Sequence, residues 1–183
     1  MMTLAEQKLK QNVAEYLLFL WQMEDLVRAV YFDPDALDEF IRTYTPNEEA
    51  FQLEKRWFRD LVRKMRSERV EVRGHVSDVL ELLFELNYLH GTLLNVFKDK
   101  TYSELYRAAK PHIEAYTQRS DGKALNEIET CLTALYGLLL LRLKKEPISP
   151  ETEESMASFT ALMARLAHHY KLMKQGEMNF SQN

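Results

Sequence analysis

The chain has 183 residues, a net charge of −4, five glycines, five prolines and one cysteine. This length is sufficient for one domain with a substantial core, and so little glycine and proline favours long helices over many turns. The composition excludes an internal disulfide, and the mild net charge indicates no particular class of partner.

Membrane spans and targeting signals are not expected. The first ten residues lack the basic region and apolar stretch of a secretory signal. The longest apolar run, residues 134–141, is far shorter than the roughly 20 residues that a membrane helix needs. The single cysteine, Cys131, lies in this apolar region and is expected to be buried. We therefore expect a cytoplasmic protein that does not contact a membrane.

Helical segments account for most of the chain. We predict seven helices, approximately at residues 4–32, 35–43, 47–70, 75–98, 102–119, 123–145 and 150–175. Their starts are indicated by Thr-x-x-Glu capping boxes at Thr3, Thr45 and Thr101, and by prolines suited to the first helical position at Pro34, Pro46 and Pro150. Gly74 should separate the third helix from the fourth, Pro111 should kink or split the fifth, and residues 120–122 should form a turn.

The predicted fold class is all-α. No segment alternates with a period of two, so no sheet is expected. The short loops predict a single-domain antiparallel helical bundle of six longer helices and one short helix. This bundle should occupy residues 1–175, with residues 176–183 as a flexible C-terminal tail.

The third predicted helix carries a stripe of arginines. Eight basic and three acidic residues between positions 55 and 73 give this segment a net charge of +5, so the remainder of the chain carries −9. Such a stripe is a candidate site for an anion or a protein partner, at Arg56, Arg59, Arg63 and Arg66. The simpler interpretation, which we favour, is that most of these arginines pair with carboxylates on neighbouring helices.

A second candidate site is a polar cluster on otherwise apolar helix faces. Asn87 and His90 lie among the leucines of the fourth predicted helix, and buried amides and imidazoles need partners. We predict that Glu24 or Gln22 of the first helix lies within hydrogen-bonding reach of Asn87 or His90. The candidate pocket therefore consists of Gln22, Glu24, Asp25, Asn87 and His90. The alternative is a satisfied network that only sets the helix register.

Sequence motifs of catalysis and cofactor binding are missing. The chain contains no Glu-x-x-His pair of the helical di-metal proteins, no G-x-S-x-G elbow, no phosphate loop and no dinucleotide fingerprint. We therefore expect no cofactor, no metal ion and no catalytic residue that can be named.

The sixth predicted helix is apolar around most of its circumference between Cys131 and Leu141. A central position in the bundle accounts for this composition. Alternatively, part of the surface at residues 138–141 forms a homodimer interface, because large exposed apolar patches are rare on monomers.

The N-terminal region carries a distinctive pattern. Residues 12–28 read Asn-Val-Ala-Glu-Tyr, then an apolar stretch to Trp21, then Gln-Met-Glu-Asp-Leu-Val-Arg, and Phe32-Asp33 follow. This pattern resembles the opening of an uncharacterised family of small all-helical proteins from Bacteroidetes, a domain of unknown function. The resemblance implies a bacterial cytoplasmic protein and supplies no catalytic or binding residues.

Three functions remain open from the sequence. The first, which we favour, is a non-enzymatic interaction or regulatory protein with an unknown protein partner, because charge asymmetry occurs without a catalytic constellation. The second is an enzyme or small-ligand binder that uses the polar pocket. The third is nucleic-acid or anion binding through the arginine stripe, against which the plentiful internal carboxylates argue.

Overall fold

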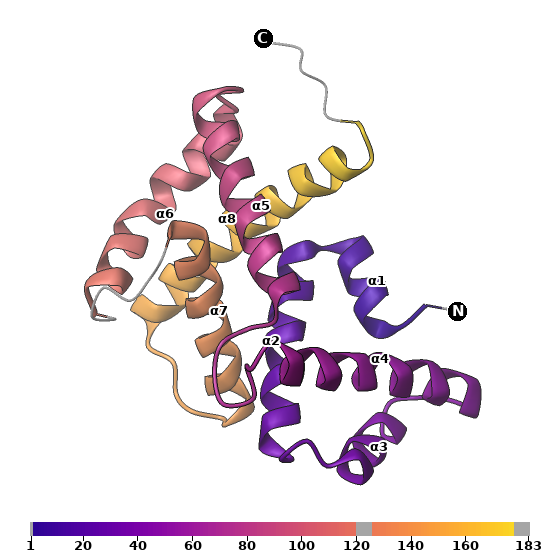
Figure 1. Ribbon diagram of the computed structural model, residues 1–183. Helices are drawn as coiled ribbons and strands as arrows, with labels where there is room; N and C mark the ends of the chain where they lie inside the picture. The colour runs from indigo at the N-terminus through magenta and orange to yellow at the C-terminus, as the bar shows by residue number, and fades with distance from the viewer. Residues whose placement is uncertain (1, 120–125, 178–183) are drawn as a thin grey trace. The chain divides into compact units, whose positions relative to one another are not determined.

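The structure is a computed structural model that describes residues 2–119 and 126–177. Within these ranges it contains eight α-helices and no β-strand (Figure 1). The predicted all-α class is therefore confirmed, whereas the predicted number of seven helices is too low. The chain divides into two compact units, Met1–Leu82 and Leu83–Asn183, and each is described by itself below.

The first unit contains helices α1 (Leu4–Gln11), α2 (Val13–Ala29), α3 (Pro34–Arg42) and α4 (Glu48–Ser67). The single helix predicted over residues 4–32 is wrong, because the chain breaks at Asn12. The Asn12 side chain accepts hydrogen bonds from the backbone N–H groups of Ala14 and Glu15 at 2.9 and 3.2 Å. An asparagine side chain that replaces backbone acceptors in this way starts a new helix.

Other helix starts also depend on short polar side chains. The capping box at Thr3 is confirmed, and Pro34 and Pro150 occupy the first turns of their helices as predicted. The boxes predicted at Thr45 and Thr101 are wrong. Asn47 caps α4 instead, and Asp99 accepts from the backbone N–H of Tyr102 at 2.6 Å. Asparagine and aspartate are stronger N-caps than threonine, which explains both shifts.

Helix α4 crosses α2 in the first unit, and α3 lies against α4 (Figure 1). The core of this unit consists of side chains that are at most 2 % exposed, among them Leu17, Val27, Ile41, Phe51, Phe58 and Met65. One long face of α4 is thereby buried, and the opposite face lies on the surface.

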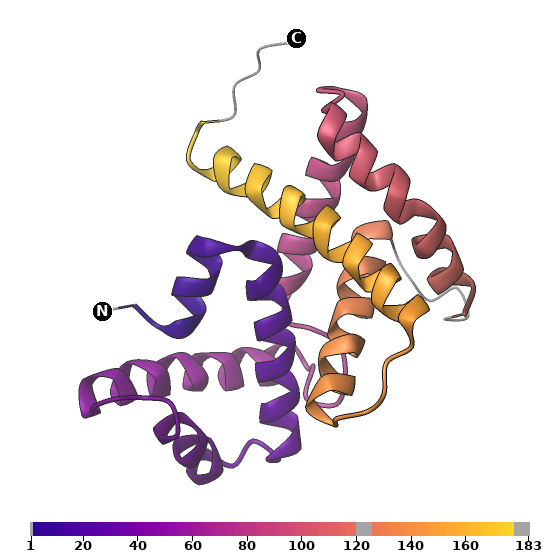
Figure 2. The same ribbon diagram turned by 180° about the vertical axis from the view of Figure 1, so that it is seen from behind.

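Helix α5 (Ser77–Asn95) begins in the first unit and continues into the second, which also contains α6 (Lys100–Arg119), α7 (Glu127–Leu143) and α8 (Pro150–Lys174). Helix α8 lies against both α6 and α7 (Figure 2). Helix α6 continues through Pro111, so the predicted split is wrong, and the alternative of a kink stays a prediction. The turn predicted at residues 120–122 and most of the predicted tail, residues 178–183, lie outside the described residues.

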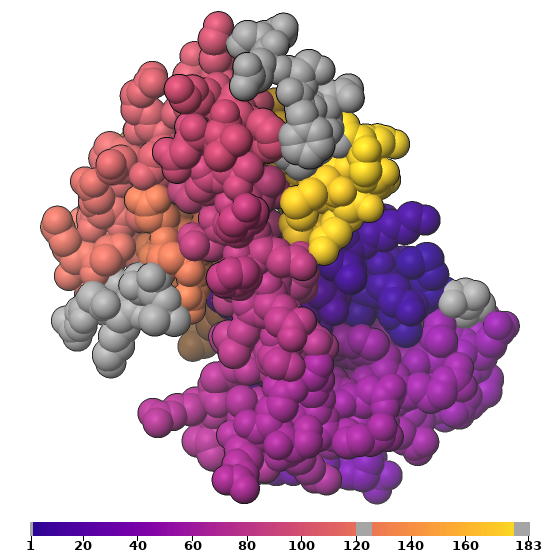
Figure 3. Space-filling model, turned by 45° about the horizontal axis from the view of Figure 1, so that its top comes forward, coloured from indigo at the N-terminus to yellow at the C-terminus, as the bar shows by residue number. Residues whose placement is uncertain are grey.

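Part of α5 lies on the surface. Phe84 and Tyr88 are 73 % and 70 % exposed, and side chains of α5 are visible across the middle of Figure 3. Leu86, Leu89 and Leu93 on the opposite side of the helix are at most 2 % exposed. The helix therefore buries one face and presents aromatic side chains on the other.

Candidate functional site

The arginine surface of α4, defined as Arg56, Arg59, Arg63 and Arg66, is exposed along its whole length. These side chains follow one another at intervals of three and four residues, which places them on one side of an α-helix. The helix rises about 15 Å between Arg56 and Arg66. The surface is therefore a narrow basic strip on the side of α4 away from the core.

The expectation that most of these arginines pair with carboxylates is wrong for the described part of the chain. Only Arg63 has a carboxylate partner there, Asp60 at 3.1 Å, and both side chains are largely exposed. Arg66 lies over the ring of Phe32, with 5.3 Å from its guanidinium carbon to the ring centroid. The side chains of Arg56 and Arg59 form no hydrogen bond or ion pair with residues 2–119 or 126–177.

The lysines of α4 behave differently from its arginines. Lys55 forms an ion pair with Asp38 of α3, and Lys64 forms one with Asp78 at the start of α5. Acidic side chains of the first unit are thus used by the two lysines that flank the arginine surface. The arginines, which are more versatile in binding carboxylates, remain available at the surface.

Aromatic side chains next to the arginine surface are used in packing. The ring of Trp57 lies 5.7 Å from that of Phe19 and 5.0 Å from that of Phe58, measured between centroids. Phe58 is 2 % exposed and also contacts Phe40. These rings are therefore not placed to stack on bases of a bound nucleic acid.

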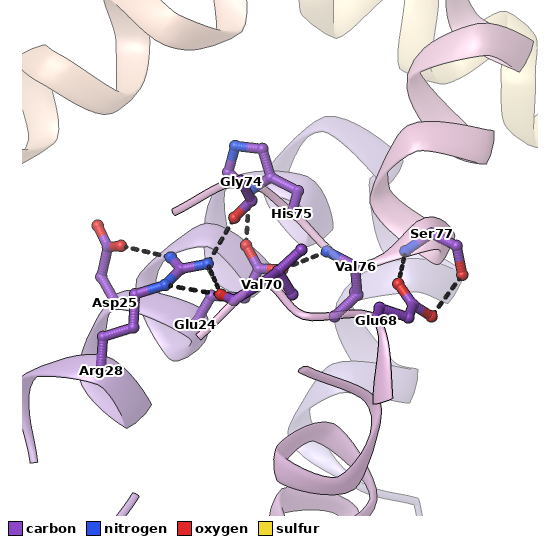
Figure 4. A network of polar contacts seen from close by, with 9 residues as sticks. All are labelled: Glu24, Asp25, Arg28, Glu68, Val70, Gly74, His75, Val76 and Ser77. Carbon is purple, nitrogen blue, oxygen red and sulfur yellow. Dashed lines mark hydrogen bonds and ion pairs between the residues drawn. The ribbon is translucent and has the colours of Figure 1, made fainter. Parts of the chain in front are cut away.

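A polar network fixes the loop that follows α4 (Figure 4). The Glu24 side chain is fully buried in α2, where one carboxylate oxygen accepts from the backbone N–H of Val76 at 2.8 Å. The other carboxylate oxygen lies 2.5 Å from Nδ1 of His75. Because a carboxylate can only accept a hydrogen bond, Nδ1 of His75 carries a proton and its N–H donates a hydrogen bond to Glu24. The His75 ring also stacks on Trp21, with 4.7 Å between centroids.

Two further side chains complete this network (Figure 4). Arg28 of α2 donates to the backbone carbonyls of Val70, at 3.0 Å, and Gly74, at 2.5 Å, and pairs with Asp25 at 3.0 Å. Glu68 accepts from the backbone N–H and the hydroxyl of Ser77. The loop between α4 and α5 is therefore held from both sides, although Gly74 has a φ of +89°.

This network explains why charged residues interrupt the apolar helix α2. A buried carboxylate needs hydrogen-bond donors, and the loop supplies a backbone amide and an imidazole. The Glu24–His75 pair resembles an activated base in its hydrogen bonding. The described residues place no hydroxyl or thiol nucleophile in hydrogen-bonding contact with His75, so the geometry favours a structural role.

The predicted pocket residues have different environments. Glu24 is bonded to His75 and Val76 of the first unit, and His90 is bonded to residues of the second, so the predicted pocket that joins them stays a prediction. Gln22 is half-buried and Asp25 is exposed. The placement of Asn87 on the apolar face is wrong, because Asn87 is exposed. It lies about 100° around the helix from the buried Leu86, past the edge of the apolar face.

His90 belongs to a buried network of the second unit. Its Nδ1 lies 2.7 Å from the hydroxyl of Tyr102, and its Nε2 lies 3.2 Å from the carboxylate of Glu127. The hydroxyl of Tyr106 donates to the same carboxylate at 2.9 Å. Burial lowers the pKa of His90 below its ordinary value, and Glu127 opposes this shift. Burial and Glu127 raise the pKa of Tyr106 to about 12. These side chains satisfy one another's hydrogen-bonding groups and are suited to linking α5, α6 and α7.

Residues 2–119 and 126–177 contain neither a cluster of metal ligands nor a helix that could span a membrane. In these residues no three histidine, cysteine, aspartate or glutamate side chains gather where they could hold a metal ion. No helix in the same ranges has the length and the apolar content needed to cross a bilayer.

Comparison with known proteins identifies the family and no closer relative. No curated protein and no solved structure matches the chain. A family model described as a domain of unknown function, DUF4924, matches residues 2–177, which is nearly the whole length. The chain therefore belongs to the family of proteins defined by the domain of unknown function DUF4924.

Proposed function

We propose that this chain is a cytoplasmic, non-enzymatic interaction protein that binds an acidic polypeptide segment through the arginine surface of α4. The observation that carries the proposal is the contrast between the paired lysines and the arginines of this helix. Lys55 and Lys64 are bonded to carboxylates of the same unit, whereas Arg63 alone has such a partner among the four arginines in the described residues.

The ion pair between Arg63 and Asp60 is weak. Its side chains are 77 % and 69 % exposed, so water screens their attraction. Exposed ion pairs of this kind contribute about 0–1 kcal/mol. A partner's carboxylate can therefore replace Asp60 at little cost. It can also bind Arg56 or Arg59 through two of the three guanidinium nitrogens.

Three features favour a polypeptide over a nucleic acid. The surface contains a carboxylate, Asp60, which a mixed-charge protein surface can match and a uniformly anionic phosphate backbone cannot. Trp57 and Phe58 are used in packing, so bases have no stacking platform. The net charge of −4 repels a nucleic acid, which carries one negative charge per nucleotide, more strongly than a short peptide with a few carboxylates.

The spacing of the arginines defines the complementary partner. A helical segment with carboxylates three and four residues apart presents them over the same distance of about 15 Å. Such a segment can lie along α4 and pair with each arginine in turn. Because every pair remains partly in water, we expect fast and weak binding of an isolated peptide.

The experiment uses nitrogen-15 labelled protein and an alanine-rich helical peptide with glutamates at these intervals. Titration should shift the side-chain N–H signals of Arg56, Arg59 and Arg63, and those of Arg107 and Arg142 should stay in place. The variant Arg59→Glu/Arg63→Glu should lose the response. Arg107→Glu/Arg142→Glu is the matched control, because it reverses the same number of exposed arginines on α6 and α7 and should respond as the wild type does.

Two outcomes would overturn the proposal. One is an unchanged spectrum at millimolar peptide, or an equal loss of response in the control variant. The other is tighter binding of a DNA duplex at the same arginines with a steep dependence on salt, which would show that phosphate contacts dominate.

A further inference from the structure

We infer that the second unit contains a binding site for a small amphipathic carboxylate, at two adjoining pockets formed by α6, α7 and α8. The first pocket lies between α6 and the start of α8 and has a volume of about 310 Å³. The second lies over α7 and has a volume of about 380 Å³. Tyr116, Thr152 and Met156 line both, so the pockets share a wall.

The first pocket is polar at its rim. Arg119 and Glu151 form an ion pair there at 3.2 Å, and their side chains are 74 % and 75 % exposed. The Ser155 hydroxyl donates to the backbone carbonyl of Glu151 at 3.0 Å and lies 2.9 Å from Nδ1 of His112. With the serine proton committed to the carbonyl, His112 donates from Nδ1, and the pair forms a hydrogen-bonding wall for a ligand.

The second pocket is apolar. Its walls include Ala134, Leu138 and Leu141 of α7 together with Met156 of α8. At Gly137, in the middle of α7, an added Cβ would meet no atom within 4 Å. A glycine inside a helix costs about 1 kcal/mol relative to alanine. No packing contact among the described residues requires a glycine here. A ligand chain that lies against the helix backbone at this position would require one.

Charge complementarity selects the headgroup of the ligand. Among the described residues that line the two pockets, Arg119 and Lys144 are cationic and Glu151 is acidic. A ligand carboxylate can displace Glu151 from Arg119, because an exposed ion pair is weak and Glu151 remains hydrated. The apolar part of the same ligand then covers Gly137. A carboxylic acid with an unbranched apolar chain satisfies both requirements.

The experiment uses the full chain labelled with carbon-13 in its methionine methyl groups and titrated with octanoate. Met156 is 6 % exposed and lines both pockets, so its signal should shift and saturate. Met23 and Met65 lie in the first unit and should not respond. The uncharged analogue 1-octanol should bind at least fivefold more weakly. Arg119→Gln should weaken octanoate at least fivefold and leave 1-octanol unchanged.

The glycine variants supply the matched control. Gly137→Leu should fill the apolar pocket and abolish the response to both compounds. Gly91→Leu makes the same change at a helical glycine of α5 that also has no atom within 4 Å of an added Cβ, and it should leave binding intact. Circular dichroism establishes that each variant is folded, and Arg119→Gln tests the headgroup without altering the apolar wall.

Three results would contradict the inference. They are the absence of a saturable shift at Met156, equal affinities for octanoate and 1-octanol, and unchanged binding by folded Gly137→Leu. Light scattering tests whether a second copy of the chain occupies the apolar pocket instead of a ligand. If the protein is a dimer that dissociates in Gly137→Leu and does not dissociate with octanoate, the second copy is the occupant, which would also contradict the inference.

Discussion

Replacement of Glu24 tests the role of the buried network in the first unit. Glu24→Ala removes the acceptor of the Val76 N–H, and Val76 itself is 1 % exposed. It also removes the acceptor of the His75 imidazole. An unsatisfied buried donor costs about 1–3 kcal/mol, so the two together predict a loss of about 3 kcal/mol. For a unit of this size, that loss lowers the melting temperature by about 12–24 °C.

The assay is thermal unfolding followed by tryptophan fluorescence. The chain has two tryptophans, Trp21 and Trp57, and both belong to the first unit, so this signal reports on that unit alone. Glu24→Gln is the matched variant. Its amide can accept from Val76 and donate to the other tautomer of His75, so its melting temperature should fall by only about 4–8 °C. Equal melting temperatures for Glu24→Ala and the wild type would refute the reasoning.

Three other perturbations have defined outcomes. Burial holds the pKa of His90 below its unfolded value of about 6.5, so the unfolded chain binds more protons below that pH and stability falls on acidification. The variant His90→Gln should lose less stability between about pH 7.5 and 5.5, as measured by circular dichroism melting. Burial raises the pKa of Cys131 to about 12, so iodoacetamide should modify it slowly in the native protein and rapidly in denaturant, and rapid native labelling would contradict its burial. Gly74→Ala should lower the fluorescence melting temperature because alanine is strained by about 1–2 kcal/mol at positive φ, whereas Gly91→Ala, in a helix, should raise the circular dichroism melting temperature; a stabilising Gly74→Ala would rule out strain at that position.

Helix propensity and capping signals predicted most of the fold. The long helices of the second half and the break near Gly74 follow from where glycine, proline and apolar residues occur. Asn12 shows the limit of this reasoning. It lies inside a continuous helical pattern, and only its side-chain bonds to two backbone amides reveal that a new helix begins there. Whether a side-chain oxygen or a backbone carbonyl accepts from a given backbone N–H is difficult to predict from residue types alone.

The candidate sites were predicted less well, because they depend on which residues meet across the fold. The sequence identified Glu24 as a buried polar residue that needs a partner, but it pointed to α5 residues and missed His75. His75 was predicted at the start of a helix, whereas it lies in the loop between α4 and α5, where its side chain reaches Glu24. The Ser155–His112 contact joins positions 43 residues apart and has no sequence signature. For the arginines of α4, the number of available carboxylates favoured pairing, whereas geometry assigns carboxylates to the two lysines.

The most direct measurement of the proposed function is a charge exchange at the arginine surface. The four exposed arginines of α4 are replaced together by glutamate, and circular dichroism checks that the helix content is retained. The wild type should bind the glutamate peptide and not its lysine counterpart, and the reversed variant should show the opposite preference. A reversed variant that is folded and still prefers the glutamate peptide, or a wild type that binds neither peptide, would contradict the proposal that this surface recognises an acidic segment.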